Sequence, residues 1–192
     1  MAVITFPSVA RITKRQWLLN VPQQINRSGF TGRRRVVGLP GSETWHLSAA
    51  VEPLTTERQA RAWRAFLSAL RGAESSFRMQ ALPTKQIGFA NPLVTAPVIG
   101  NRAVAVNSTA GIEIGMMATV HQNDGFERMV VVVGIAAPQI HFEPYLIFDP
   151  LIGAPMEFQY PWAVMSLTGG DQGGWDDTNG ITAISFTAEE AL

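Results

Sequence analysis

Cysteine is absent from the 192-residue chain, which excludes disulfides, thiolate metal ligands and thiol nucleophiles. Long apolar runs are also missing. The longest uncharged one, Met129–Ile135, is far shorter than the roughly 20 residues that span a bilayer. The first residues, Met1–Pro7, lack the basic start of a signal peptide. We therefore expect a chain with no membrane partner and no secretory leader.

Signatures of catalysis and metal binding are equally scarce. The histidines His46, His121 and His141 are widely spaced, and no two of them have the spacing of a zinc site. There is no Gly-x-Ser-x-Gly elbow and no phosphate-binding loop. The acidic loop that contains Asp171 and Asp176 lacks the register of a calcium loop. We predict a protein that is not an enzyme, with no catalytic residue, metal or cofactor.

Charge is distributed unevenly along the chain, although the formal net charge is zero. Residues 1–96 hold thirteen of the fifteen Lys and Arg against four Glu, whereas residues 97–192 hold two Arg against eleven acids. The two halves can neutralise each other within one subunit, or they can form complementary faces between copies of the chain. Nucleic-acid binding by the basic half is a third possibility, which the acidic half opposes.

Three consecutive arginines, Arg33, Arg34 and Arg35, form the sharpest charge cluster and follow the turn at residues 29–32. Such a cluster is a solvated loop tip, a clamp for carboxylates of an adjacent subunit, or a phosphate contact. We favour the contact between subunits, because no aromatic residues are interleaved to stack bases. Near the C-terminus, Glu189 and Glu190 are the acidic candidates for a contact between subunits.

One helix is expected, over residues 56–71, between strand-like segments on either side. Thr55 or Thr56 can cap its start, and Gly72 can end it in a left-handed conformation. Four apolar side chains are expected to pack this helix on a sheet. Trp63, Leu67 and Leu70 recur at three- and four-residue spacing, and Phe66 widens the apolar stripe that they form.

A separate group of short strands is predicted within residues 93–150, and Asp124-Gly125 is a tight-hairpin signal there. Its size matches a small closed barrel of the OB type. The strands expected after residue 150 rejoin the first sheet in the simplest topology. We therefore predict a mainly β chain. Residues 1–92 and 151–192 form a β-sandwich with one packed helix, and residues 93–150 form an inserted OB-like barrel.

The order of several local features resembles one protein family. In chain order these features are Phe6-Pro7, Trp17, Ser28–Gly32 before a basic strand, Trp45, Pro53-Leu54-Thr55 at the start of the helix, Leu70-Arg71-Gly72 at its end, and Phe77. The chain is similar to the distal tail proteins of long-tailed bacteriophages, which form a ring-shaped hub at the tail tip. It resembles the T5-like members in particular, which carry an inserted OB-fold domain.

This resemblance implies a tail-tube-like β-sandwich that assembles into a homo-oligomeric ring, expected to be hexameric, in the virion tail, from chains made in the host cytoplasm. It also implies that the ring connects the tail tube protein to the hub proteins of the tip or baseplate, and that DNA is a partner only in passage through the lumen. Two other interpretations stay open. One is a binding module whose barrel recognises carbohydrate or single-stranded nucleic acid, and the other is a different tube-like tail protein.

Overall fold

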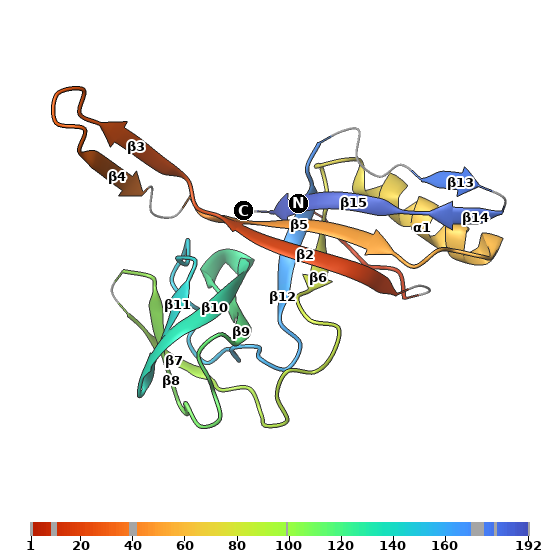
Figure 1. Ribbon diagram of the computed structural model, residues 1–192. Coiled ribbons are helices and arrows are strands. Elements are labelled where there is room, and N and C mark those ends of the chain that lie inside the picture. Colours follow the sequence, from red (N-terminus) through yellow and green to blue (C-terminus); the bar gives the residue numbers. More distant parts are fainter. Residues whose placement is uncertain are drawn as a thin grey trace.

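The computed structural model describes residues 2–8, 11–38, 42–98, 100–169, 175–178 and 180–191, so Asp171 of the acidic loop lies outside the described residues. The described part is mainly β with one α-helix, as predicted (Figure 1). Its strands form a six-stranded sheet, a five-stranded sheet and two separate strand pairs. No helix within these ranges is long and apolar enough to cross a membrane.

The six-stranded sheet combines strands from both ends of the sequence. In spatial order its strands are β1 (Val3–Ile4), β6 (Ser76–Gln80), β12 (Trp162–Leu167), β15 (Ser185–Glu190), β5 (Thr44–Val51) and β2 (Ile12–Asn20). β1 runs parallel to β6, and the other neighbours are antiparallel. The strict alternation of β5 sends Trp45, Leu47 and Ala49 to the core side of the sheet.

The helix, α1 (Glu57–Leu70), has ends that follow from its sequence. Thr56 is extended, and its hydroxyl accepts a hydrogen bond from the backbone N–H of Gln59, as expected of an N-cap. The helix stops because Arg71 and Gly72 both adopt left-handed conformations, with φ of 49° and 66°. The left-handed conformation was predicted at Gly72, and in the structure it begins one residue earlier, at Arg71.

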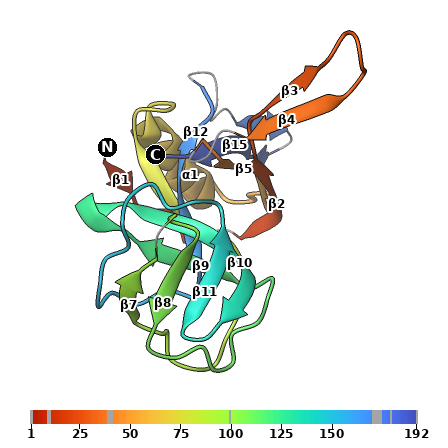
Figure 2. The same cartoon turned by 90° about the vertical axis from the view of Figure 1, so that its left-hand side faces the viewer.

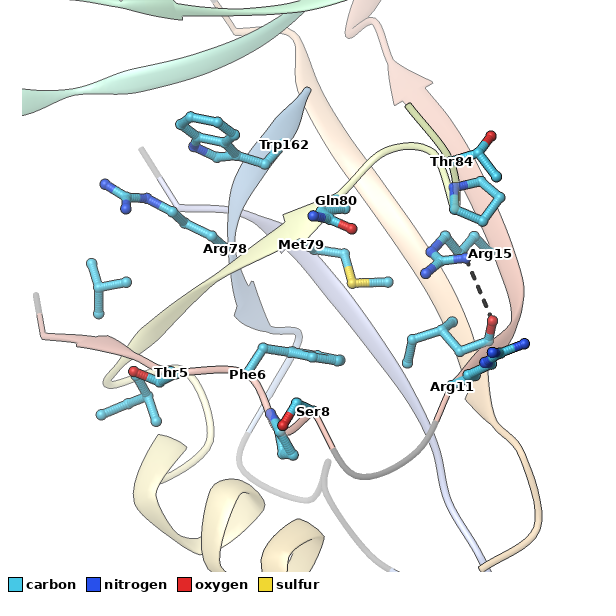
Figure 3. Close-up of a pocket in the computed structure, with 15 residues that line it drawn as sticks. Thr5, Phe6, Ser8, Arg11, Arg15, Arg78, Met79, Gln80, Thr84 and Trp162 are labelled. Carbon is cyan, nitrogen blue, oxygen red and sulfur yellow. Dashed lines mark hydrogen bonds between the residues drawn. The ribbon is translucent and has the colours of Figure 1, made fainter. Parts of the chain in front are cut away.

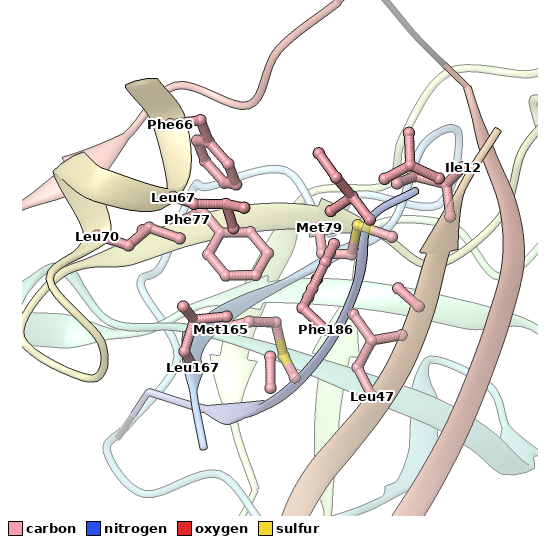
Figure 4. Packing of buried hydrophobic residues seen from close by; sticks show 14 of the residues in the cluster. Ile12, Leu47, Phe66, Leu67, Leu70, Phe77, Met79, Met165, Leu167 and Phe186 are labelled. Atoms are coloured by element: carbon pink, nitrogen blue, oxygen red, sulfur yellow. The ribbon is translucent and has the colours of Figure 1, made fainter. Parts of the chain in front are cut away.

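The core of the six-stranded sheet lies between the sheet and this helix (Figure 4). The four helix side chains expected to face the sheet have exposed fractions of 0–5%: Trp63, Phe66, Leu67 and Leu70. Phe66 meets Phe77 of β6 edge to face, with ring centroids 5.5 Å apart. Phe77 meets Phe186 of β15 in the same way at 5.8 Å. Each buried large side chain contributes about 1.5–3 kcal/mol, so the helix is held firmly on the sheet.

The five-stranded sheet comes entirely from the middle of the chain. Its antiparallel strands, in spatial order, are β7 (Val94–Pro97), β8 (Ala103–Val106), β11 (Gln139–Glu143), β10 (Glu127–Ala136) and β9 (Met117–His121). The short 3-10 helix η1 (Asn123–Gly125) joins β9 to β10, and φ is positive at Asp124 and Gly125, where the hairpin signal lay. Ile87, Met156 and Phe158 also pack in the core of this sheet, so this core extends beyond residues 93–150 at both ends.

Two further strand pairs belong to neither sheet, and one of them bridges to the segment after β5 through Leu54 and Thr182. One consists of β3 (Gln23–Arg27) and β4 (Arg34–Gly38), and the other of β13 (Asp176–Thr178) and β14 (Ile181–Ala183).

The helix packing generates a stability prediction at Trp63, which is fully buried and whose indole N–H has no hydrogen-bond partner. Trp63→Ala should lower the free energy of unfolding by about 3–5 kcal/mol, because it leaves a cavity under the helix. Trp63→Phe should cost clearly less, since it also removes the unpartnered N–H. Urea unfolding followed by circular dichroism measures both, with the exposed Ser68→Ala as control. Equal losses for Ala and Phe would contradict this account of the core.

Candidate functional site

The strand pair β3–β4 stands away from both sheets (Figures 1 and 2), and we refer to residues 23–38 as the arm. Every residue of the arm is exposed, and its two strands pair with each other alone among the described strands. Strands of five residues extend the arm by roughly 17 Å, at about 3.3 Å per residue. A two-stranded hairpin without a packed face is at best marginally stable in water. The arm therefore has no packed face within the described part of the chain.

Apolar side chains are distributed over both faces of the arm. The register pairs Ile25 with Val36 on one face and Gln24 with Val37 on the other. Phe30, at the tip, is 100% exposed. An aromatic anchor beside arginines is typical of the centre of a protein interface.

The basic side chains of the arm repel one another. Arg27 lies directly opposite Arg34 in the register, and Arg33 and Arg35 are the sequence neighbours of Arg34. Like charges opposite each other across two strands are destabilising. Residues 23–38 contain no acid, and none of these four arginines forms an ion pair within the described part of the chain. Carboxylates of a partner would relieve this repulsion.

The acidic candidates, Glu189 and Glu190, lie inside the six-stranded sheet rather than at an edge. They belong to β15, which pairs with β12 on one side and β5 on the other. Glu189 is exposed, whereas Glu190 points to the opposite face and is 4% exposed. The expected contact of Glu190 with another subunit does not hold, because this carboxylate is used within the chain.

The start of β10 connects the two sheets through charged groups. Arg78 of β6 donates two hydrogen bonds to Glu127, at 2.7 and 2.8 Å. Nε1 of Trp162, in β12, donates another hydrogen bond to Glu127 at 2.8 Å, and Nδ1 of His121 lies 3.4 Å from Glu127 Oε1. Burial alone would raise the pKa of Glu127, but these hydrogen bonds and the positive charge of Arg78 outweigh burial and lower the pKa to about 2.

The next residue, Arg128, is fully buried between the sheets. Its Nε lies 3.5 Å from Glu190 Oε1, and one Nη donates to the carbonyl oxygen of Glu43. Trp45 donates its backbone N–H to Glu190 at 3.2 Å and its indole N–H to the carbonyl oxygen of Met129 at 2.7 Å. Burial raises the pKa of Glu190 to about 7, although the charge of Arg128 and the Trp45 N–H oppose the rise.

Ion pairs between the basic and the acidic half of the sequence are few. Among the described residues, Arg78 pairs with Glu127, and Arg102 lies 3.8 Å from Glu43. The other described ion pairs join residues of the same half. Neutralisation of one half by the other within the chain is therefore local, and the arm takes no part in it.

Phe30 and Arg128 were not identified from the sequence as contact residues. A signal existed for Arg128, because it directly precedes the uncharged run 129–135, and a charge in a strand covered on both faces requires a buried partner. Phe30 lies in a turn next to Gly29. A turn has no hydrophobic periodicity, so its sequence does not indicate whether an aromatic side chain is exposed or buried.

Comparison of the chain with models of protein families gave no match, and comparison with curated proteins gave none either. Within the described ranges, no group of three or more His, Asp or Glu side chains is placed to hold a metal ion.

The low pKa of Glu127 predicts how stability depends on pH. A carboxyl whose pKa falls from its ordinary value near 4.5 to about 2 on folding stabilises the protein above about pH 4.5. That contribution is lost as the pH falls from 4.5 to 2. Glu127→Gln should therefore be less stable than the wild type at pH 7, and the gap should shrink across this window. Urea unfolding over a pH series measures it, with the exposed Glu74→Gln as control. A gap that stays constant down to pH 2 would contradict the assignment.

The buried pair of Arg128 and Glu190 predicts strong coupling between the two residues. Arg128→Met should cost about 3–5 kcal/mol, because it leaves the Glu190 carboxylate buried without a cation. Adding Glu190→Gln to that variant should recover about 1–3 kcal/mol, since Gln keeps an acceptor for the Trp45 N–H.

A double-mutant cycle in urea measures this coupling. The matched control is the exposed helix pair Arg61 and Glu57, whose N–O distance is also 3.5 Å and whose coupling should be close to zero. Coupling no stronger in the buried pair than in the exposed one would contradict the role of Arg128.

Proposed function

We propose that this protein is a structural subunit of a bacteriophage tail tip, and that copies of it form a ring connecting the tail tube to the tip complex. The sequence resemblance to distal tail proteins motivates the proposal. The observation that carries it is the arm, an exposed strand pair with apolar and basic side chains and no packed face of its own. The proposed location is the virion tail.

The direction of the arm is compatible with a ring. Because the arm points away from its own body (Figure 1), it can reach a surface of another copy. In the proposed ring, each copy holds the arm of one neighbour and extends its own arm to the other, and such a heterologous contact repeats from copy to copy until its rotation closes. The four arginines of the arm, facing a neighbour with an excess of acids in the second half of its sequence, would set the register.

The five-stranded sheet is, in this proposal, an inserted OB-like barrel within a tail-tube-like sandwich. Two isolated bridges support closure of the barrel, because they join the segment after β11 to both sides of the sheet. Leu93, just before the edge strand β7, bridges to Pro155, and Thr119 of the other edge strand, β9, bridges to Glu157.

The alternative function, recognition of single-stranded nucleic acid by this barrel, has less support. The barrel segment 93–150 contains two basic residues, Arg102 and Arg128. Arg128 is fully buried, and Arg102 pairs with Glu143 at 3.3 Å and stacks on Tyr145 at 3.7 Å. Both cations are used inside the chain, which leaves none to track a phosphate backbone.

Assembly of the full chain tests the proposal. Wild-type protein should form one closed oligomer at low salt and dissociate as salt rises, because screening weakens the arginine contacts. The triple substitution of Arg33, Arg34 and Arg35 by Ala should raise the concentration needed for assembly by about tenfold or more. Light scattering after size exclusion measures mass, and negative-stain micrographs give the symmetry.

The matched control removes three positive charges elsewhere, with Arg58, Arg61 and Lys85 replaced by Ala, and should assemble as the wild type does. Both triple variants should unfold with the wild-type midpoint, since all six side chains are exposed. A wild-type protein that stays monomeric at every concentration and does not bind tail tips would overturn the proposal.

A further inference from the structure

A cleft of about 960 Å³ opens between β6 and β2, at the edge of the six-stranded sheet (Figure 3). β1 pairs with the first two residues of β6, Ser76 and Phe77, so Met79 and Gln80 have no neighbouring strand on that side among the described strands. Among the described strands, β2 pairs with β5 alone, and its residues Ile12 and Arg15 line the same cleft. Two strand edges without partners thus line one opening.

The cleft is closed at one end. There Trp17 of β2 donates its indole N–H to the carbonyl oxygen of Ala81, directly after β6, at 3.2 Å. The opening is therefore bounded, and its volume lies at the upper end of the range of ligand pockets, about 300–1,000 Å³.

Arg15 of β2 points into this cleft, toward Met79 (Figure 3). Its Nη1 reaches the carbonyl oxygen of Ile12 at 3.4 Å, while its Nε is buried with no hydrogen-bond partner. Burial lowers the pKa of Arg15, and no carboxylate is among the described residues that line the cleft. A partly desolvated cation without a counter-ion is costly for the free protein, which points to a ligand that supplies one.

We propose that this cleft binds an extended acidic segment of a partner polypeptide, which adds as a β-strand and places a carboxylate on Arg15. Strand addition takes its affinity from main-chain hydrogen bonds to an open edge and its specificity from alternate side chains. Phe6, Ile12 and Met79 supply apolar walls, so apolar residues should alternate with the acidic ones.

The positive charge of Arg15 also argues against the arm of a second copy as the occupant of the cleft. The arm of a second copy carries four arginines and no acid, so Arg15 would repel it. The inference does not depend on ring assembly, because the cleft lies within a single chain.

Peptide binding to the full wild-type chain tests the inference. The probe is a fluorescein-labelled peptide in which Val and Glu alternate, titrated by fluorescence anisotropy at low salt. A matched peptide with Gln in place of Glu should bind about tenfold more weakly, because it lacks the charge-assisted hydrogen bond to Arg15. A peptide of Val and Glu with alternate backbone N-methylation should also lose about tenfold, since it cannot donate the ladder hydrogen bonds of one strand edge.

Two variants locate the site. Arg15→Gln should weaken binding of the Glu peptide to the level of the Gln peptide, whereas Arg58→Gln on the exposed helix surface should leave binding unchanged. Arg15→Gln should unfold at or above the wild-type temperature, because it removes an unpaired, partly buried cation.

Equal affinity of the Glu and Gln peptides, or no binding of either, would overturn the proposal. Displacement of the Glu peptide by inorganic phosphate, together with unchanged affinity of the N-methylated peptide, would assign the cleft to small anions and would equally overturn strand addition. These peptide measurements on the wild type hold even if Arg15→Gln fails to fold.

Discussion

The arrangement of the two sheets depends on three consecutive residues at the start of β10, Glu127, Arg128 and Met129. Met129 packs in the core of the six-stranded sheet, although its strand belongs to the five-stranded one. Glu127 and Arg128 carry their charges into the same junction, where each must find a partner. A buried ion pair contributes little net stability compared with apolar packing, but an unmatched charge is expensive. The junction therefore fixes one arrangement of the two sheets by penalising the others.

A fixed junction has consequences for what the rest of the chain leaves uncovered. Helix α1 and the start of β10 contribute to the core on the inner face of the six-stranded sheet. The strand edges of that sheet are the parts that stay uncovered, and those of β6 and β2 lie at the cleft between these two strands. The arm leaves the body after Asn20, where β2 ends, and gains no cover from either sheet (Figure 2). The strand edges and the arm are the parts that the fold presents to other molecules.

How far the sequence predicted this structure differs from element to element. The helix was predictable because its apolar spacing, its N-cap Thr56 and its Gly72 all agree with one another. The exposure of the arm was not, because Ile25, Val36 and Val37 are strand-forming apolar residues of the kind that a covered strand also contains. Whether such a strand pair is covered depends on residues far away in the chain. The same limit applies to Glu190, which lies near the C-terminus yet sits in a central strand.

The cleft could not be predicted from the sequence, for a related reason. Arg15 alternates with Trp17 and Leu19 on the core side of β2, a place where the sequence pattern favours an apolar residue. Only the fold reveals that no described strand occupies the neighbouring position and that the guanidinium faces an opening. A polar residue that breaks an apolar pattern marks a site when the structure leaves it without a partner.

The uneven charge of the sequence has a more specific meaning in the folded chain. If the two halves neutralised each other in the folded chain, arginines of one half and carboxylates of the other would form many ion pairs. Among the described residues they form two. The arginines without described carboxylate partners include Arg15 and those of the arm, and these lie where the fold itself is incomplete. A hairpin without a packed face and an open strand edge are both prone to unspecific pairing, and a cation at each one discourages association with another copy of the same element. In the proposed assembly and in the proposed strand addition, the charge therefore repels like elements and favours partners that bring acids.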